Sequence, residues 1–109
     1  MKVLLDECLP RKLGRLLSGH EVTTVPQAGW AGVTNGRLLV RIAGSYDAFI
    51  TIDQNLPAQQ KTMGLTFGIV VLRCRANRLT DLSPLVPQIL AALNRLQPAQ
   101  VVVIAAVTE

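Results

Sequence analysis

The sequence predicts an α/β fold: a three-layer α/β/α sandwich around a mainly parallel five-stranded sheet, built by a single domain over residues 1–109. Three observations lead to this prediction. Half of the residues are hydrophobic but only 4% are aromatic, which is typical of an aliphatic α/β core. Short apolar runs alternate with segments of helical periodicity along the whole chain. The connections between these segments are short, and 109 residues suit one domain with a core of its own.

Strands and helices alternate in the first half of the chain. The expected elements are strands over residues 3–5, 21–25 and 48–52, helices over 10–17 and 34–43, and an irregular loop over 26–34. Pro10 suits the start of the first helix, because the N–H that proline lacks is one that a helix start leaves unpaired. Thr34 or Asn35 is expected to cap the second helix. The run from Ala48 to Ile52 is apolar and rich in β-branched residues, which predicts a buried strand.

The second half continues the same alternation. The expected elements are a short helix from Pro57 to Gly64, a strand over 68–72, a helix from Pro84 to Leu96 and a strand over 100–107. Asp81 or Ser83 is expected to cap the long helix. Residues 68–72 are apolar throughout, as expected for a parallel strand covered on both faces. Right-handed crossovers then predict the sheet order 2-1-3-4-5, in which the first and third strands are neighbours.

Two of the expected strands end in carboxylates. Asp6 and Glu7 follow the first strand, and Asp53 follows the third. Open α/β sheets bind ligands outside the carboxyl ends of their strands, so we expect Asp6 and Asp53 to converge in one crevice. A pair of carboxylates there suits a divalent cation. The alternative is a structural role, because an Asp at a strand end often caps a turn or a helix.

Five segments of the chain resemble the small PIN-like domain family of bacteria, which is similar to toxin ribonucleases of the VapC type. These segments are residues 2–10 (KVLLDECLP), 20–22 (HEV), 29–32 (GWAG), 35–39 (NGRLL) and 51–56 (TIDQNL). The resemblance implies a ribonuclease fold in which Asp6 and Asp53 are catalytic and hold Mg²⁺ or Mn²⁺, with Glu7 and Asn55 beside them as further metal ligands. Many relatives carry an acidic residue near the start of the second helix. This chain has Asn35 there, a neutral and weaker ligand.

The function that this resemblance implies is a Mg²⁺-dependent endoribonuclease that acts as the toxin of a toxin–antitoxin pair. The expected partners are RNA, a cognate antitoxin protein and, in a homodimer, a second copy of the chain. The alternative is a catalytically degenerate PIN-like module that binds RNA or a protein partner without cleavage. Intact Asp6 and Asp53 favour the enzyme, whereas Asn35 favours the degenerate module.

Four residues are candidates for contacts with RNA. Arg73, Arg75 and Arg78 follow a strand at the same edge as Asp53, which makes them the best candidates for phosphate contacts. Their alternative role is that of a solvated loop. Trp30 is a candidate for stacking on a base, and its alternative role is to close the edge of the core.

Net charge, hydrophobicity and the absence of certain motifs limit the classes of function that the chain can have. Eleven Lys and Arg against seven Asp and Glu leave a formal charge of +4, which is compatible both with a polyanionic partner and with an ordinary domain. No apolar run approaches the roughly 20 residues of a membrane span, so we expect a cytoplasmic protein. The glycine-rich and nucleophile motifs of nucleotide-binding proteins and serine hydrolases are absent. Cys8 and Cys74 are expected to be packing residues.

Overall fold

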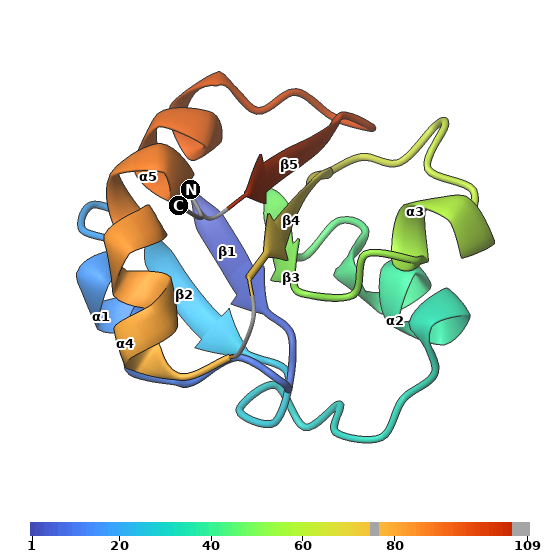
Figure 1. Cartoon of the computed structure of the whole chain (residues 1–109). Helices are drawn as coiled ribbons and strands as arrows, with labels where there is room; N and C mark the ends of the chain where they lie inside the picture. Colours follow the sequence, from blue (N-terminus) through green and yellow to red (C-terminus); the bar gives the residue numbers. More distant parts are fainter. Residues whose placement is uncertain (75–76, 106–109) are drawn as a thin grey trace.

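The computed structural model describes residues 1–74 and 77–105 and contains a five-stranded sheet in which every pairing is parallel. Its strands are β1 (Lys2–Leu5), β2 (Glu21–Thr24), β3 (Ala48–Thr51), β4 (Gly68–Arg73) and β5 (Val101–Ala105). Their order is β2-β1-β3-β4-β5, which confirms the predicted α/β class and strand order. Because the strands are parallel, their carboxyl ends lie at one edge of the sheet (Figure 1).

Helices cover both faces of the sheet. They are α1 (Leu13–Leu16), α2 (Asn35–Ile42), α3 (Leu56–Gln59), α4 (Leu79–Leu82), the 3₁₀ turn η1 (Ser83–Leu85) and α5 (Val86–Arg95). The helices α1, α4 and α5 lie on one face, and α2 and α3 lie on the other (Figure 1). The fold is therefore a three-layer sandwich, as predicted. Within the described residues, no helix has both the length and the hydrophobicity needed to cross a bilayer.

Each face of the sheet buries its own core, because successive side chains of a strand point to opposite faces. In β1, Val3 and Leu5 belong to the core beneath α1, α4 and α5, whereas Leu4 belongs to the core beneath α2. All four residues of β3 are buried. Burial on both faces explains the nearly continuous apolar runs of β1, β3 and β4.

Two of the predicted helices are shorter in the structure. The helix expected over 10–17 is reduced to α1, since its first turns close through bonds of the 3₁₀ type, such as Leu13 N–H to the Pro10 carbonyl at 3.0 Å. The helix expected from Pro57 to Gly64 is α3, which begins one residue earlier and ends at Gln59. Both are single-turn helices held by packing, since Leu13 and Leu56 are fully buried.

The long helix of the second half begins earlier than predicted. It starts at Leu79 and consists of α4, η1 and α5 in succession. The predicted caps were wrong, because Asp81 lies inside α4 and Ser83 opens η1. Pro84 lacks the N–H that a continuous helix requires, so the chain forms a 3₁₀ turn there. The final strand follows the prediction as far as Ala105, and residues 106 and 107 lie outside the described residues.

Helix α5 approaches the sheet most closely at Gly68. A Cβ atom at this position would overlap the side chain of Leu96, the residue that ends α5. Gly68 also begins β4 and pairs with Ala48 of β3. The absent side chain therefore determines how closely the end of α5 packs on the sheet.

Candidate functional site

Asp6 and Asp53 lie at the carboxyl ends of neighbouring strands. The pairing of β1 with β3 aligns Leu5 with Ile50, and the Asp6 N–H continues it with a hydrogen bond of 2.9 Å to the Ile50 carbonyl. Asp53 follows the end of β3 by two residues. Asp6 is buried and Asp53 is half-buried. Both carboxylates therefore reach the edge where the strand order reverses between β1 and β3, the position at which sheets of this type bind ligands.

The Thr51 hydroxyl connects the two acidic residues. Thr51 Oγ1 donates a hydrogen bond of 2.6 Å to Asp6 Oδ2, and it accepts one of 3.0 Å from the Asp53 N–H. Thr51 is fully buried, so these two bonds satisfy a hydroxyl that water does not reach. Thr51 was not among the site residues predicted from the sequence. The sequence feature that could have indicated its role is its position two residues before Asp53, because residues i and i+2 of an extended chain point to the same face of a sheet.

Asp53 also organises the turn that leads into α3. Its Oδ1 accepts the Asn55 N–H at 3.0 Å, and its carbonyl accepts the Leu56 N–H at 3.3 Å. These are the bonds of an Asx turn, so the structural role that we considered for a strand-end Asp is present here. Asn55 is exposed and stands at the start of α3.

Asn35 contacts Asp53 directly. It is the first residue of α2, and its side-chain amide donates a hydrogen bond of 3.2 Å to Asp53 Oδ2. Thr34 occupies the cap position of that helix, but its side chain makes no capping hydrogen bond. Asn35 therefore lies within the site, where it serves as a donor to the carboxylate.

Glu7 and Cys8 directly follow Asp6. Asp6, Glu7 and Asp53 together make this edge of the sheet acidic, and it is called the acidic edge below. Glu7 is exposed, and its Oε2 accepts the Gly32 N–H at 3.4 Å, which ties the 26–34 loop to the end of β1. Partial burial raises the pKa of the Cys8 thiol, and the negative charges of Asp6, Glu7 and Asp53 raise it further. Cys8 is exposed, so our expectation that it is a packing residue was wrong. The three carboxylates together create a negative potential at this edge.

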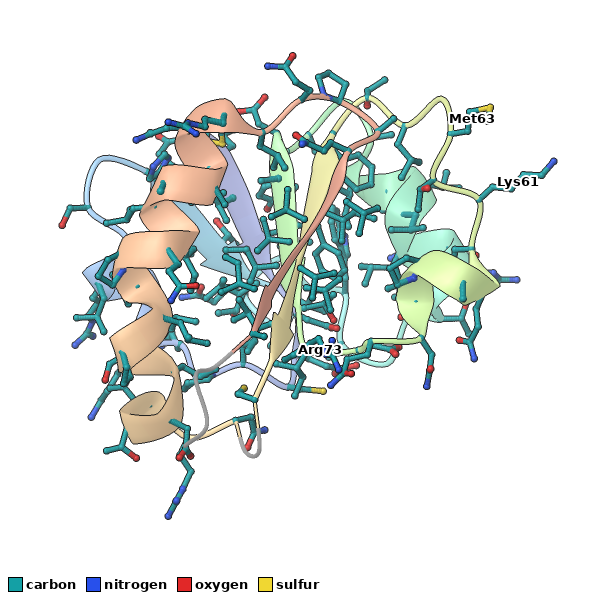
Figure 2. All side chains as sticks on the ribbon, turned by 45° about the horizontal axis from the view of Figure 1, so that its top comes forward. Lys61, Met63 and Arg73 are labelled. Carbon is teal, nitrogen blue, oxygen red and sulfur yellow. The ribbon has the colours of Figure 1, made fainter. Side chains whose placement is uncertain are left out.

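Arg73 lies beside this acidic edge. Thr51 pairs with Val71, so Arg73 and Asp53 each stand two residues further along neighbouring strands. Arg73 is exposed and lines a hollow of about 200 Å³ together with Gln54, in the segment between β3 and α3, and Pro57 of α3. Figure 2 shows Arg73 at the carboxyl end of β4, next to that segment. A cation here can contact a phosphate that approaches the acidic pair.

Arg78 and Trp30, two other predicted RNA contacts, have partners within the protein. Arg78 forms an ion pair with Asp81, with 2.9 Å between Arg78 Nε and Asp81 Oδ2. This hydrogen-bonded partner raises the pKa of Arg78. Arg75 lies outside the described residues. Trp30 packs partly buried against the core beneath α2, and its ring meets that of Tyr46 edge to face at 5.9 Å.

The acidic edge offers few groups for a metal ion. In the part of the chain that the structure describes, no three His, Cys, Asp or Glu side chains form a group able to hold a metal. The oxygen ligands at this edge come from Asp6 and Asp53, with Asn35 hydrogen-bonded to Asp53 Oδ2 and the Asn55 N–H hydrogen-bonded to Asp53 Oδ1. This set consists of hard oxygen ligands, which suit Mg²⁺ or Mn²⁺ better than a soft metal.

Comparisons with known proteins identify no relative of this chain: no family model, no curated protein and no solved structure matches it.

Proposed function

We propose that this protein is a metal-dependent endoribonuclease of the PIN-like type, acting as the toxin of a toxin–antitoxin pair. The observation that carries the proposal is the buried Thr51 hydroxyl between Asp6 and Asp53 at the switch point of the sheet. Asp53 also forms a turn, but that turn accounts for neither the buried Asp6 carboxylate nor the Thr51 hydroxyl that is hydrogen-bonded to it. Pre-oriented carboxylates at such a position are what metal-assisted phosphodiester chemistry requires.

The donor set fits one hard divalent cation. Mg²⁺ keeps several of its waters and is commonly held by one or two carboxylates, so Asp6 and Asp53 suffice without a third. The negative potential that raises the pKa of Cys8 also attracts a cation to this edge. When bound, Mg²⁺ or Mn²⁺ would supply an activated water and neutralise charge on the phosphate.

The remaining residues of the site have positioning roles in this proposal. Thr51 orients the Asp6 carboxylate through its hydrogen bond of 2.6 Å, and Asn35 orients Asp53. Glu7 and Asn55 lie beside the pair and offer further oxygen atoms. Arg73 holds the phosphate of the RNA strand as it approaches from the side of β4.

A second candidate function is an RNA-binding or protein-binding module that does not cleave. The observation that favours it is that each carboxylate oxygen of the pair already accepts a hydrogen bond. Asp6 accepts from the Glu7 N–H and from Thr51, and Asp53 accepts from the Asn55 N–H and from Asn35. An amide donor on Asp53 competes with a cation for that oxygen.

RNA cleavage tests the first function directly. Purified protein should cut single-stranded RNA in Mg²⁺ or Mn²⁺, and EDTA should stop the reaction. The variant Asp6→Asn should abolish cleavage while RNA binding persists. Arg73→Glu should weaken RNA binding most at low salt, because phosphate contacts depend on ionic strength. Lys61→Glu is the matched control, since Lys61 is an exposed cation that projects away from the acidic edge (Figure 2).

Calorimetry with Mn²⁺ separates the two candidates. Binding of one equivalent of Mn²⁺ that is lost in Asp6→Asn supports the enzyme. RNA binding without Mn²⁺ binding or cleavage identifies the non-cleaving module, and it assigns Asp6 and Asp53 to structure alone.

A further inference from the structure

A second hollow lies at the opposite end of the sheet from the acidic pair. It has a volume of about 500 Å³, and its lining includes Lys2, Glu21 and Thr23 of the sheet and the rings of Trp30 and Tyr46. This volume is within the range of small-molecule sites. The function proposed above does not use this hollow.

The floor of this hollow is formed by the sheet and carries two side chains of opposite charge that form no ion pair with each other. Lys2 and Glu21 are direct cross-strand partners in β1 and β2, and both line the hollow. Both are exposed, and the ion pair recorded among the described residues is a different one, between Arg78 and Asp81. The two side chains therefore leave adjacent positions of neighbouring strands and line the same hollow.

An aromatic pair forms the wall. Trp30 and Tyr46 are half-buried and meet at 5.9 Å with an interplanar angle of 84°. The backbone holds both in place, through bonds of 3.0 Å from Trp30 N–H to the Val25 carbonyl and from Tyr46 N–H to the Ile42 carbonyl. Two perpendicular rings that are already packed offer a rigid apolar surface to a planar ligand.

From this arrangement we infer that the hollow binds the guanine base of single-stranded RNA. The Watson–Crick edge of guanine presents the O6 acceptor next to the N1–H and N2–H donors. The Glu21 carboxylate can accept both donors, while the Lys2 ammonium donates to O6. The base then lies against an aromatic ring, the mode by which proteins read unpaired bases. Adenine and cytosine each offer the carboxylate one exocyclic amino group and no ring N–H.

The hollow and the acidic pair lie on the same face of the sheet. Lys2, Leu4 and Asp6 are alternate residues of one extended segment, so their side chains point to the same face of the sheet. Leu4 belongs to the core beneath α2, which identifies that face. Four residues at about 3.3 Å each separate Lys2 from Asp6 by roughly 13 Å. Leu4, which lies between them, is fully buried beneath α2, so an RNA strand that reaches both has to pass over the outside of the layer that covers this face. The inference rests on the proposed function for the identity of its ligand, but base binding itself requires neither metal nor cleavage.

The test uses the fluorescence of Trp30, the sole tryptophan of the chain. The protein in EDTA is titrated with GMP, IMP, AMP and CMP, with excitation at the red edge and free tryptophan amide as the control for absorption. GMP should quench at the lowest concentration. IMP, which lacks the N2 amino group, should bind about tenfold more weakly, as expected for one lost hydrogen bond to a charged group. Equal quenching by all four nucleotides, or by none of them in the millimolar range, overturns the inference.

Variants of Glu21 and Lys2 test whether these two charged side chains recognise the guanine base. Glu21→Gln should remove the preference for GMP over AMP, and Lys2→Met should weaken GMP binding about tenfold. Lys61→Met, which loses an equal charge outside the hollow, should bind GMP like the wild type. A preference for GMP that survives in Glu21→Gln refutes the inference.

The two proposals fail separately. RNA cleavage by a protein that binds GMP no better than AMP leaves the nuclease intact and removes the guanine site. Selective GMP binding by a protein that neither binds Mn²⁺ nor cleaves RNA supports the guanine site and removes the nuclease.

Discussion

The Thr51 hydroxyl donates a hydrogen bond of 2.6 Å to Asp6 Oδ2 across 45 positions of sequence. The bond joins the carboxyl ends of β1 and β3, and the Asp53 N–H bond to the same hydroxyl at 3.0 Å extends it to a second acidic residue. The acidic pair is thus coupled through one buried oxygen atom. Stability and function of this edge depend on that atom in ways that can be measured separately.

Thr51→Val removes the hydroxyl while it keeps the shape of the side chain. It leaves a buried Asp6 oxygen and the Asp53 N–H without this partner, so the free energy of unfolding should fall by about 1–3 kcal/mol. Urea denaturation measures this change. Thr51→Ser keeps the hydroxyl and loses one methyl group, so it should cost about 1 kcal/mol or less. Equal stability of Thr51→Val and wild type would show that the bond contributes nothing.

Asp53 can be tested as a turn former by two substitutions in EDTA. Asp53→Ala removes the acceptor of the Asn55 N–H and should destabilise the protein by about 1–2 kcal/mol. Asp53→Asn keeps one side-chain oxygen for that N–H and should cost less. An increase in stability of Asp53→Asn would instead indicate that repulsion within the acidic edge exceeds the value of the turn.

Asn35→Asp places a further carboxylate where an amide nitrogen now stands 3.2 Å from Asp53 Oδ2. Repulsion should raise the pKa of one of the two carboxyls in the folded variant. A folded-state pKa above the unfolded value destabilises the protein at higher pH, and the penalty disappears as pH falls below the unfolded pKa. The variant should therefore be less stable than wild type at pH 7, and the difference should disappear as the pH falls below about 3.5. Mn²⁺ should restore stability at pH 7, because it binds the added ligand.

Cys8 reports the charge of the acidic edge. Burial and the charges of Asp6, Glu7 and Asp53 raise its thiol pKa above the ordinary value. Alkylation of Cys8 by iodoacetamide should therefore reach half its maximal rate at a higher pH in the folded protein than in urea, as followed by peptide mass spectrometry. Glu7→Gln and added Mg²⁺ should each lower that pH. Glu21→Gln, at the other end of the sheet, should leave it unchanged.

Gly68→Ala tests the close approach of α5 to the sheet. The new methyl group overlaps the Leu96 side chain, so we expect a loss of about 1–3 kcal/mol in the free energy of unfolding. Gly36→Ala is the control, because a Cβ there meets only Gln60 Oε1 at 3.4 Å and the residue lies within α2. That substitution should be neutral or stabilising by up to about 1 kcal/mol. Similar losses in both variants would contradict the steric explanation.

The sequence by itself determined the class and order of the sheet. Apolar runs such as 48–52 and 68–72 are short and rich in β-branched residues, which indicates strands covered on both faces, and short right-handed crossovers between them leave few arrangements. The acidic residues after the first and third strands could therefore be assigned to one edge before any coordinates were known. The expected helix from Pro84 was less accurate. Its start at Leu79 depends on packing of Leu82 in the core, which helix-capping patterns do not report.

Only the tertiary structure decided which groups touch. Thr51 and Asp6 meet because the register pairs Leu5 with Ile50, and a shift of one residue would turn Thr51 to the other face. Asn35 reaches Asp53, and Lys2 stands beside Glu21, because separate crossovers bring their elements together. The periodicity of hydrophobic residues along the chain indicates whether a residue is buried or exposed. The partner of a polar atom depends on contacts between distant segments, so hydrogen bonding at this edge and the hollow beside Trp30 could not be derived from the sequence.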